Sequence, residues 1–174
     1  MPIQEVLQLG DPRLREVCSP VSQMDIDKVE SIVTDLHDTL AHWRSTTTYG
    51  RGIAAPQIGA MERIVFVNVD RPWVLLNPEI VERSPDTMVV WDACLSFLCI
   101  FFQVTRNQWI RVRYQDITGK SHETVAYGEM SELLQHEIDH LDGILSLDRI
   151  TDIKTLCTRE EFEKRYRSTS PYAV

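Results

Sequence analysis

Hydrophobic residues recur at spacings of three and four between residues 27 and 43, and this period predicts a helix. The repeating positions are Val29, Ile32, Val33, Leu36, Leu40 and Trp43. Asp25 or Asp27 is expected to cap the start of the helix. His37 and His42 are five residues apart and do not share a face, so we expect surface or packing roles for them rather than metal binding.

After a polar stretch at residues 45–49, which predicts a loop, short β-branched and apolar runs predict strands. The runs cover residues 64–69, 74–76, 87–91, 109–114 and 121–126. Asn77 and Pro78 are expected to end the second run. The turn signal around Gly119 is expected to join the last two runs as a hairpin.

A second helix is predicted from residue 131 onward, with Gly143 as its C-cap. A third is expected over residues 159–167, packing through Phe162 and Tyr166. Together these elements predict an α+β fold, in which mixed or antiparallel sheets pack around a central helix with the sequence His-Glu-X-X-His.

Length and charge narrow the class of protein. The 174 residues suffice for one domain, residues 1–174, with its own core. A net charge of −8 argues against direct reading of nucleic acid through a broad basic surface. The longest apolar run, residues 95–102, is too short to cross a bilayer, and residues 1–5 lack the features of a secretory signal. We therefore expect a cytoplasmic protein without a membrane partner.

The second helix carries the candidate chemistry. His136 and His140 are four residues apart, so both imidazoles face one side of the helix and can share a divalent metal. Glu137 would lie beside a metal-bound water, where it could take a proton and pass it to a leaving group. The alternative is a surface helix whose polar residues face solvent. The motif favours hydrolysis by a metal-activated water.

A catalytic metal usually has three protein ligands and one open position, so one more ligand is needed. Spacing alone leaves four cysteines, one further histidine and many carboxylates as candidates: Cys18, Cys94, Cys99, Cys157 and His122, with the acids. The four cysteines are too few for a disulfide scaffold. Cys94 follows a predicted strand that could hold it rigidly, although a buried core cysteine is the alternative.

Three segments, in order, resemble the signature motifs of the peptide deformylase family: residues 50–57, 92–96 and 135–143. The segment 10–14 and the chain length are similar too, so the resemblance covers nearly the whole chain. On its own, the segment around Gly50 and Gly52 would indicate only a tight turn or a close backbone approach. The resemblance implies a metallohydrolase that removes the formyl group from the N-terminal formyl-methionine of new polypeptides.

The resemblance also implies the site residues. One metal ion would be held by Cys94, His136 and His140, most commonly Fe²⁺ and sometimes Zn²⁺, with Ni²⁺ or Co²⁺ as substitutes. Glu137 would transfer the proton, and Gln57 and the backbone N–H of Leu95 would stabilise the oxyanion. Gly52 would hold the substrate backbone. The implied partners are an N-formylated peptide and the translating ribosome, with the protein a monomer or a weak homodimer.

Two departures from the family lie around the second motif. Asp92-Ala93 replaces the usual Glu-Gly, and we expect Asp92 to pair with Arg106. Residues 97–102 are apolar and without a turn signal, where members have a Pro-Gly turn, polar residues and in some cases an arginine. We expect this run to be an exposed hydrophobic patch that could bind a protein.

Two further departures concern the methionine pocket. Arg51 replaces an apolar residue near it, and Glu132 lies four residues before His136 on the ligand face of the helix. We expect a polar pocket with Arg51 and Glu132 paired. The alternatives are a more open site, or two side chains turned outward.

Two functions follow from these patterns. The first is a deformylase, with ordinary or altered substrate preference. The second is a protein of deformylase fold that holds a metal and binds a partner without turnover. The complete set of candidate catalytic residues favours the enzyme, because binding alone needs neither Glu137 nor Gln57.

Overall fold

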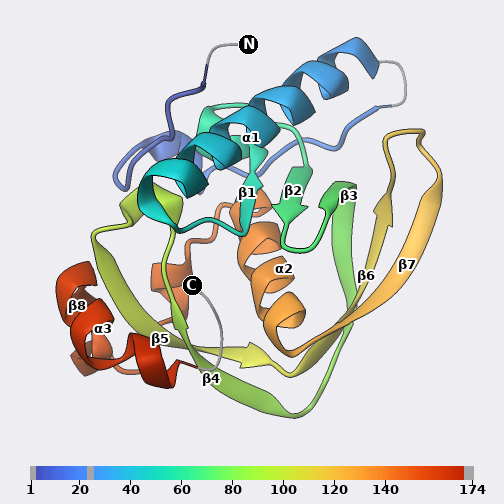
Figure 1. The fold of residues 1–174 in the computed structure, drawn as a ribbon. Coiled ribbons are helices and arrows are strands. Elements are labelled where there is room, and N and C mark those ends of the chain that lie inside the picture. Colours follow the sequence, from blue (N-terminus) through green and yellow to red (C-terminus); the bar gives the residue numbers. More distant parts are fainter. Residues whose placement is uncertain (1–2, 23–25, 171–174) are drawn as a thin grey trace.

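The computed structural model describes residues 3–22 and 26–170. In chain order the helices and strands are α1 (Ile26–Thr47), β1 (Gly52–Ala54), β2 (Ile64–Asn68), β3 (Pro72–Arg83), β4 (Thr87–Asp92), β5 (Ile100–Asn107), β6 (Trp109–Gln115), β7 (Ser121–Tyr127), α2 (Gly128–Leu141), β8 (Cys157–Thr158) and α3 (Arg159–Arg165). One sheet has the order β1-β2-β3-β6-β7 and the other β4-β5-β8, and neighbouring strands are antiparallel in both. Helix α2 lies between the two sheets (Figure 1). The predicted α+β fold is confirmed.

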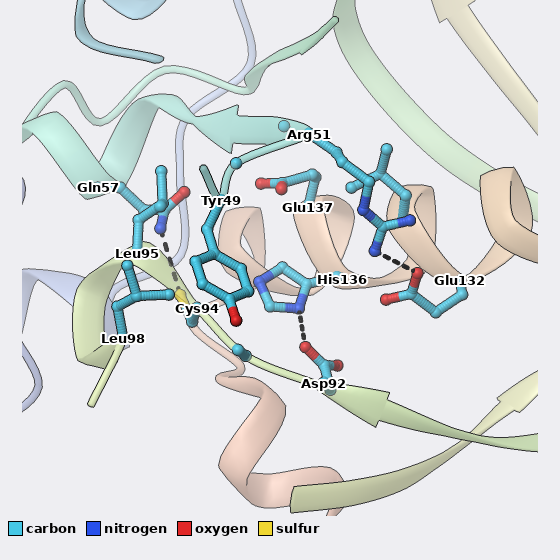
Figure 2. Close-up of a pocket in the computed structure, with 14 residues that line it drawn as sticks. Tyr49, Arg51, Gln57, Asp92, Cys94, Leu95, Leu98, Glu132, His136 and Glu137 are labelled. Carbon is cyan, nitrogen blue, oxygen red and sulfur yellow. Dashed lines mark hydrogen bonds and ion pairs between the residues drawn. The ribbon is translucent and has the colours of Figure 1, made fainter. Parts of the chain in front are cut away.

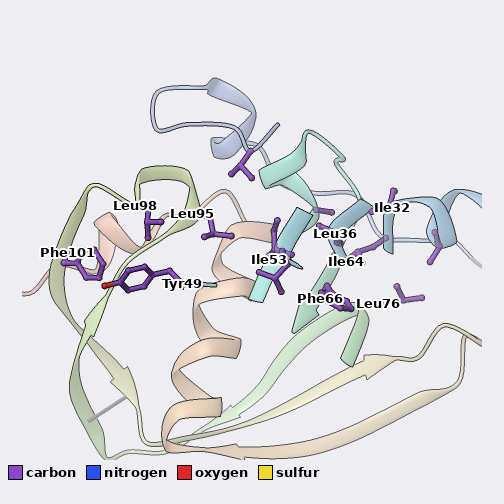
Figure 3. Packing of buried hydrophobic residues seen from close by; sticks show 14 of the residues in the cluster. Ile32, Leu36, Tyr49, Ile53, Ile64, Phe66, Leu76, Leu95, Leu98 and Phe101 are labelled. Carbon is purple, nitrogen blue, oxygen red and sulfur yellow. The ribbon is translucent and has the colours of Figure 1, made fainter. Parts of the chain in front are cut away.

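Helix α1 buries the predicted stripe against β1 and β2 (Figure 3). The helix continues to Thr47, so the loop predicted for residues 45–49 is mostly wrong. The hydroxyl groups of Thr46 and Thr47 donate to the carbonyls of His42 and Trp43, four residues earlier, and so add side-chain hydrogen bonds to the last turns. Asp27 lies in the first turn rather than at the cap, and Asp25 lies outside the described residues.

Strand β3 continues through the expected stop at Asn77 and Pro78, so that prediction is wrong. The register with β6 shifts between Leu76 and Glu79, which is a bulge, and Asn77 has a left-handed φ of 49°. A bulge tolerates a proline that cannot donate a hydrogen bond. The Asn77 side chain bonds the backbone of Val21 and so fastens the bulge to the N-terminal segment.

Residues 97–102 are not an exposed patch. Phe97, Phe101 and Phe102 are buried, and Cys99 is the exposed member of the run. Phe97 ends a short 3-10 helix over Leu95–Phe97, a turn follows, and β5 begins at Ile100, so the run is not turnless either. Its apolar side chains are covered by segments distant in sequence.

Helix α3 provides part of that cover. It ends at Arg165, two residues earlier than predicted, and packs through the expected residues. The ring of Phe162 stacks on Phe101 with 4.4 Å between centroids, and Tyr166 stacks on Trp91 at 4.7 Å.

Helix α2 is buried from Ser131 to Leu141. Gly143 follows it with a left-handed φ of 70°, its N–H donates to His140 O, and the Ile144 N–H donates to Asp139 O. This pair of bonds is a Schellman motif, so Gly143 ends the helix as predicted. In the part of the chain that the structure describes, no helix is both long and apolar enough to cross a bilayer.

Candidate active site

The segment after β4 and the buried helix α2 bring three metal-binding side chains together. The Sγ of Cys94 lies 3.3 Å from Nε2 of His140, which lies 3.3 Å from Nε2 of His136. All three residues are buried. Two nitrogens bound tetrahedrally to one metal at the usual bond lengths are about 3.3 Å apart. The converging thiol and imidazoles therefore fit a divalent metal such as iron or zinc.

A hydrogen bond to Asp92 fixes the orientation of the His136 ring. Its Nδ1 lies 2.8 Å from Oδ1 of Asp92, which leaves Nε2 facing the other two ligands. Arg106 donates to the other oxygen of Asp92 at 3.1 Å, as the sequence predicted. Although burial opposes its charge, His136 and Arg106 hold the pKa of Asp92 below its ordinary value. The bond from Asp92 to His136 was not predicted.

Asp139 of α2 extends this network to Arg149. Its carboxylate accepts from Arg106 at 2.6 Å and from Arg149 at 2.8 Å. Asp139 stands inside the signature segment, so the sequence contained a signal for it. The sequence contained no signal for Arg149, because only the fold brings this residue close to the helix.

Glu137 is the unpaired acid of the site. It is buried, and its Oε2 has no hydrogen-bond partner among the described residues. Burial raises the pKa of Glu137 to about 7. Its Oε1 would lie 2.7 Å from a Cβ at position 52, so Gly52 leaves the space that this carboxylate occupies. A carboxyl group with this pKa can both accept and donate a proton near neutral pH.

Gln57 and Leu95 supply donors on the other side of the ligands (Figure 2). The Oε1 of Gln57 accepts from the Ala54 N–H at 2.9 Å, which turns its amide nitrogen toward Cys94 Sγ and Ser96 Oγ, each at 3.3 Å. Leu95 is the first residue of its 3-10 helix, so its N–H has no acceptor within that helix. Ser96 is a contact that the sequence did not reveal.

Arg51 and Glu132 form a charged wall of the same pocket. Nη2 of Arg51 donates to Oε2 of Glu132 at 2.8 Å, and Nη1 donates to Glu129 Oε1 at 3.2 Å. The Glu132 side chain is 3% exposed and that of Arg51 14%, so neither turns outward. Burial raises the pKa of Glu132 above its ordinary value, although Arg51 opposes the shift. The expected pair is present, and Glu129 is an unexpected third member.

Tyr49 is a further pocket residue that the sequence did not single out. Its hydroxyl group donates to Oε1 of Glu163 at 2.9 Å, and the Arg167 guanidinium lies 5.1 Å from its ring centroid. These partners are more than one hundred residues away, so the local pattern carried no signal for Tyr49.

The fold and the donor set are those of a metal-dependent hydrolase. A family model described as polypeptide deformylase matches residues 3–156. The peptide deformylase of Thermotoga petrophila is 39% identical over 153 residues, which cover 87% of this chain and 90% of the relative.

Solved structures agree with the family match. The crystal structure of peptide deformylase from Thermotoga maritima is 34% identical, with a TM-score of 0.81, over 87% of this chain and 100% of that chain. The Met-Ala-Ser-bound class I type b peptide deformylase from Acinetobacter baumannii is 29% identical, with a TM-score of 0.79, over 86% and 99%. The chain belongs to the peptide deformylase family. It is an enzyme that removes the N-formyl group from newly made polypeptides.

Proposed function

We propose that the chain hydrolyses N-terminal formyl-methionine with one divalent ion, Fe²⁺ first and Zn²⁺ second, held by Cys94, His136 and His140. The observation that carries this proposal is the convergence of their three donor atoms in one buried cluster. The pocket also contains Glu137 and Gln57, which supply a proton carrier and a hydrogen-bond donor. The Acinetobacter relative, which binds Met-Ala-Ser, supports a peptide in this pocket.

The bound metal would supply Lewis acidity and lower the pKa of a water molecule. Glu137 accepts a proton from the attacking water and donates it to the nitrogen of the formamide, so the carbon–nitrogen bond breaks into formate and a free amine. Gln57 Nε2 and the Leu95 N–H donate to the formyl oxygen as it gains negative charge. Asp92 keeps His136 in its orientation throughout, and Gly52 leaves the space that the Glu137 carboxylate needs.

Formate release from formyl-Met-Ala-Ser by anaerobically purified, iron-loaded protein tests this proposal. Glu137→Gln removes the proton carrier and keeps the shape, so we expect kcat to fall by about 10² to 10⁴. Its metal content should remain one ion per chain, which elemental analysis checks. Cys94→Ser is the companion variant and should lose the metal. Full turnover by Glu137→Gln with metal bound would contradict the assigned role.

The second function inferred from the sequence, binding without turnover, rested on an exposed patch at residues 97–102, and these apolar residues are buried. No structural observation therefore favours it. For the enzyme we propose action in the cytoplasm close to the ribosome, as one catalytic domain and as a monomer or weak homodimer. Analytical sedimentation would test the oligomeric state, and co-pelleting with ribosomes would test the proximity to the ribosome.

A further inference from the structure

Arg51 and Glu132 of the charged wall line the same pocket as Cys94, His136 and Glu137, and Glu129 joins the wall from a side chain that is 40% exposed. A carboxylate oxygen of Glu132, one of Asp92 and a ring nitrogen of His136 all lie within 4.8 Å of one another. Figure 2 shows Arg51 and Glu132 on one side of His136, with Gln57 and Cys94 on the other. Gln57, Glu137, Arg51 and Glu132 line one pocket, so a peptide whose formyl group lies next to the first two can place its first side chain against the last two.

With both glutamates ionised, the wall carries one formal negative charge in excess. Burial raises the pKa of Glu132, and a cation beside it would favour the ionised form. Among the described residues, Arg51 is the one cation bonded to Glu129 and Glu132. It is not shared with Asp92, whose hydrogen bonds come from Arg106 and His136. The excess charge therefore belongs to the two glutamates.

The buried glutamate also has an unused acceptor. Arg51 is the donor to Oε2 of Glu132, and among the described residues no donor reaches its Oε1. Glu132 lines the pocket, so that acceptor is available to a ligand. A thioether such as methionine has no proton to donate, and covering a carboxylate with it removes water without replacing the hydrogen bond.

We infer that this wall makes the enzyme prefer N-formyl peptides whose first side chain is cationic, of the lysine or arginine type, over formyl-methionine. The inference rests on the proposed function, because the same residues carry out the hydrolysis. A cation would balance the formal excess charge and donate to Glu132, whereas an apolar side chain leaves the Oε1 of Glu132 without a donor. Sites with such groups discriminate strongly against ligands that cannot satisfy them.

The test is kcat/KM for formate release from four peptides, formyl-X-Ala-Ser, with X as lysine, glutamine, methionine or norleucine. The norleucine peptide is an apolar chain of methionine's length, and glutamine is a neutral donor. For the native chain we expect lysine to exceed methionine and norleucine at least tenfold, with glutamine between them. The double variant Arg51→Val/Glu132→Leu should reverse the order.

The matched control is Arg111→Val/Glu82→Leu, which changes an exposed ion pair of β6 and β3 by the same residue types. Its order of substrates should equal that of the native chain. Glu132→Gln keeps the shape of the wall and removes its excess charge, so it should lower the lysine value alone. This variant decides the question should the apolar pair fail to fold.

The outcomes separate this inference from the function on which it rests. Methionine as the best substrate of the native chain, whatever the order in the pocket variants, would overturn the preference and leave the deformylase standing. No formate from any peptide, with the native chain and the pocket variants folded and loaded with metal, would overturn the proposed function itself.

Discussion

At the scale of single residues, position 52 shows how a missing side chain shapes the site. A Cβ there would lie 2.7 Å from Oε1 and 3.0 Å from Cδ of Glu137. Gly52→Ala must therefore displace the Glu137 carboxylate. A displacement of about 1 Å can cost about 10²-fold in rate, so we expect a loss of that order in kcat/KM for formate release.

A double-mutant cycle tests the cause. Glu137→Ala removes the side chain that the new methyl group would meet, so Gly52→Ala should lower the free energy of unfolding less in that background than in the native chain. Denaturant unfolding of the four proteins measures both costs. Equal costs in the two backgrounds would place the clash elsewhere.

The sequence predicted some residues of the site and could not predict others. The sequence could predict His136, Glu137 and His140, because one turn of helix fixes their relative positions. Cys94 became a specific candidate only through the resemblance, since spacing left several cysteines open. The bond between Asp92 and His136 joins residues 44 positions apart, and nothing in their local pattern could indicate it.

At the scale of elements, the sequence predicted helices and strands correctly where one face of the element is buried. It was misleading where contacts between distant segments decide the end of a strand or the burial of a side chain. The stripe of α1 was found, and so was the β6–β7 hairpin, whose register pairs Trp109 with Tyr127. Asn77 and Pro78 suggested the end of a strand because both are typical of turns, yet a bulge accommodates them. Phe101 seemed exposed because its partner Phe162 comes 61 residues later.

The contact between helix α3 and Tyr49, made by Glu163, leads to a prediction at this scale. Burial raises the pKa of Tyr49 to about 12, and its bond to Glu163 acts in the same direction. The ordinary value is about 10. The folded state thus favours the neutral phenol, and this stabilisation is complete below pH of about 10 and lost as the pH rises toward 12.

Tyr49→Phe removes that ionisation. We expect the native chain's advantage over Tyr49→Phe in the free energy of unfolding to shrink between about pH 10 and 12. Urea titrations at several pH values would measure it. Tyr127→Phe is the matched control, because Tyr127 is 66% exposed. An advantage of the native chain that stays constant to pH 12 would show that the Tyr49 phenol is not perturbed.

At the scale of the whole molecule, the metal ligands join parts that the backbone keeps separate. Cys94 follows β4 of the three-stranded sheet, whereas His136 and His140 belong to α2, which packs on the five-stranded sheet. An ion bound to all three would connect the two halves of the fold. It would bind the folded chain in preference to the unfolded one, and so stabilise it.

Removing the metal should therefore lower the stability of the whole domain. At a free metal concentration one hundred times the Kd, the expected difference is about 2.7 kcal/mol, seen as a lower Tm after chelation and recovered when Fe²⁺ or Zn²⁺ is added back. Cys94→Ser should remove this increment, and Cys99→Ser, at an exposed thiol, should keep it. A full increment in Cys94→Ser would mean that the stabilising ion is bound by other residues. Its loss in Cys94→Ser alone would tie the stability of both halves to the same three side chains that we assign to catalysis.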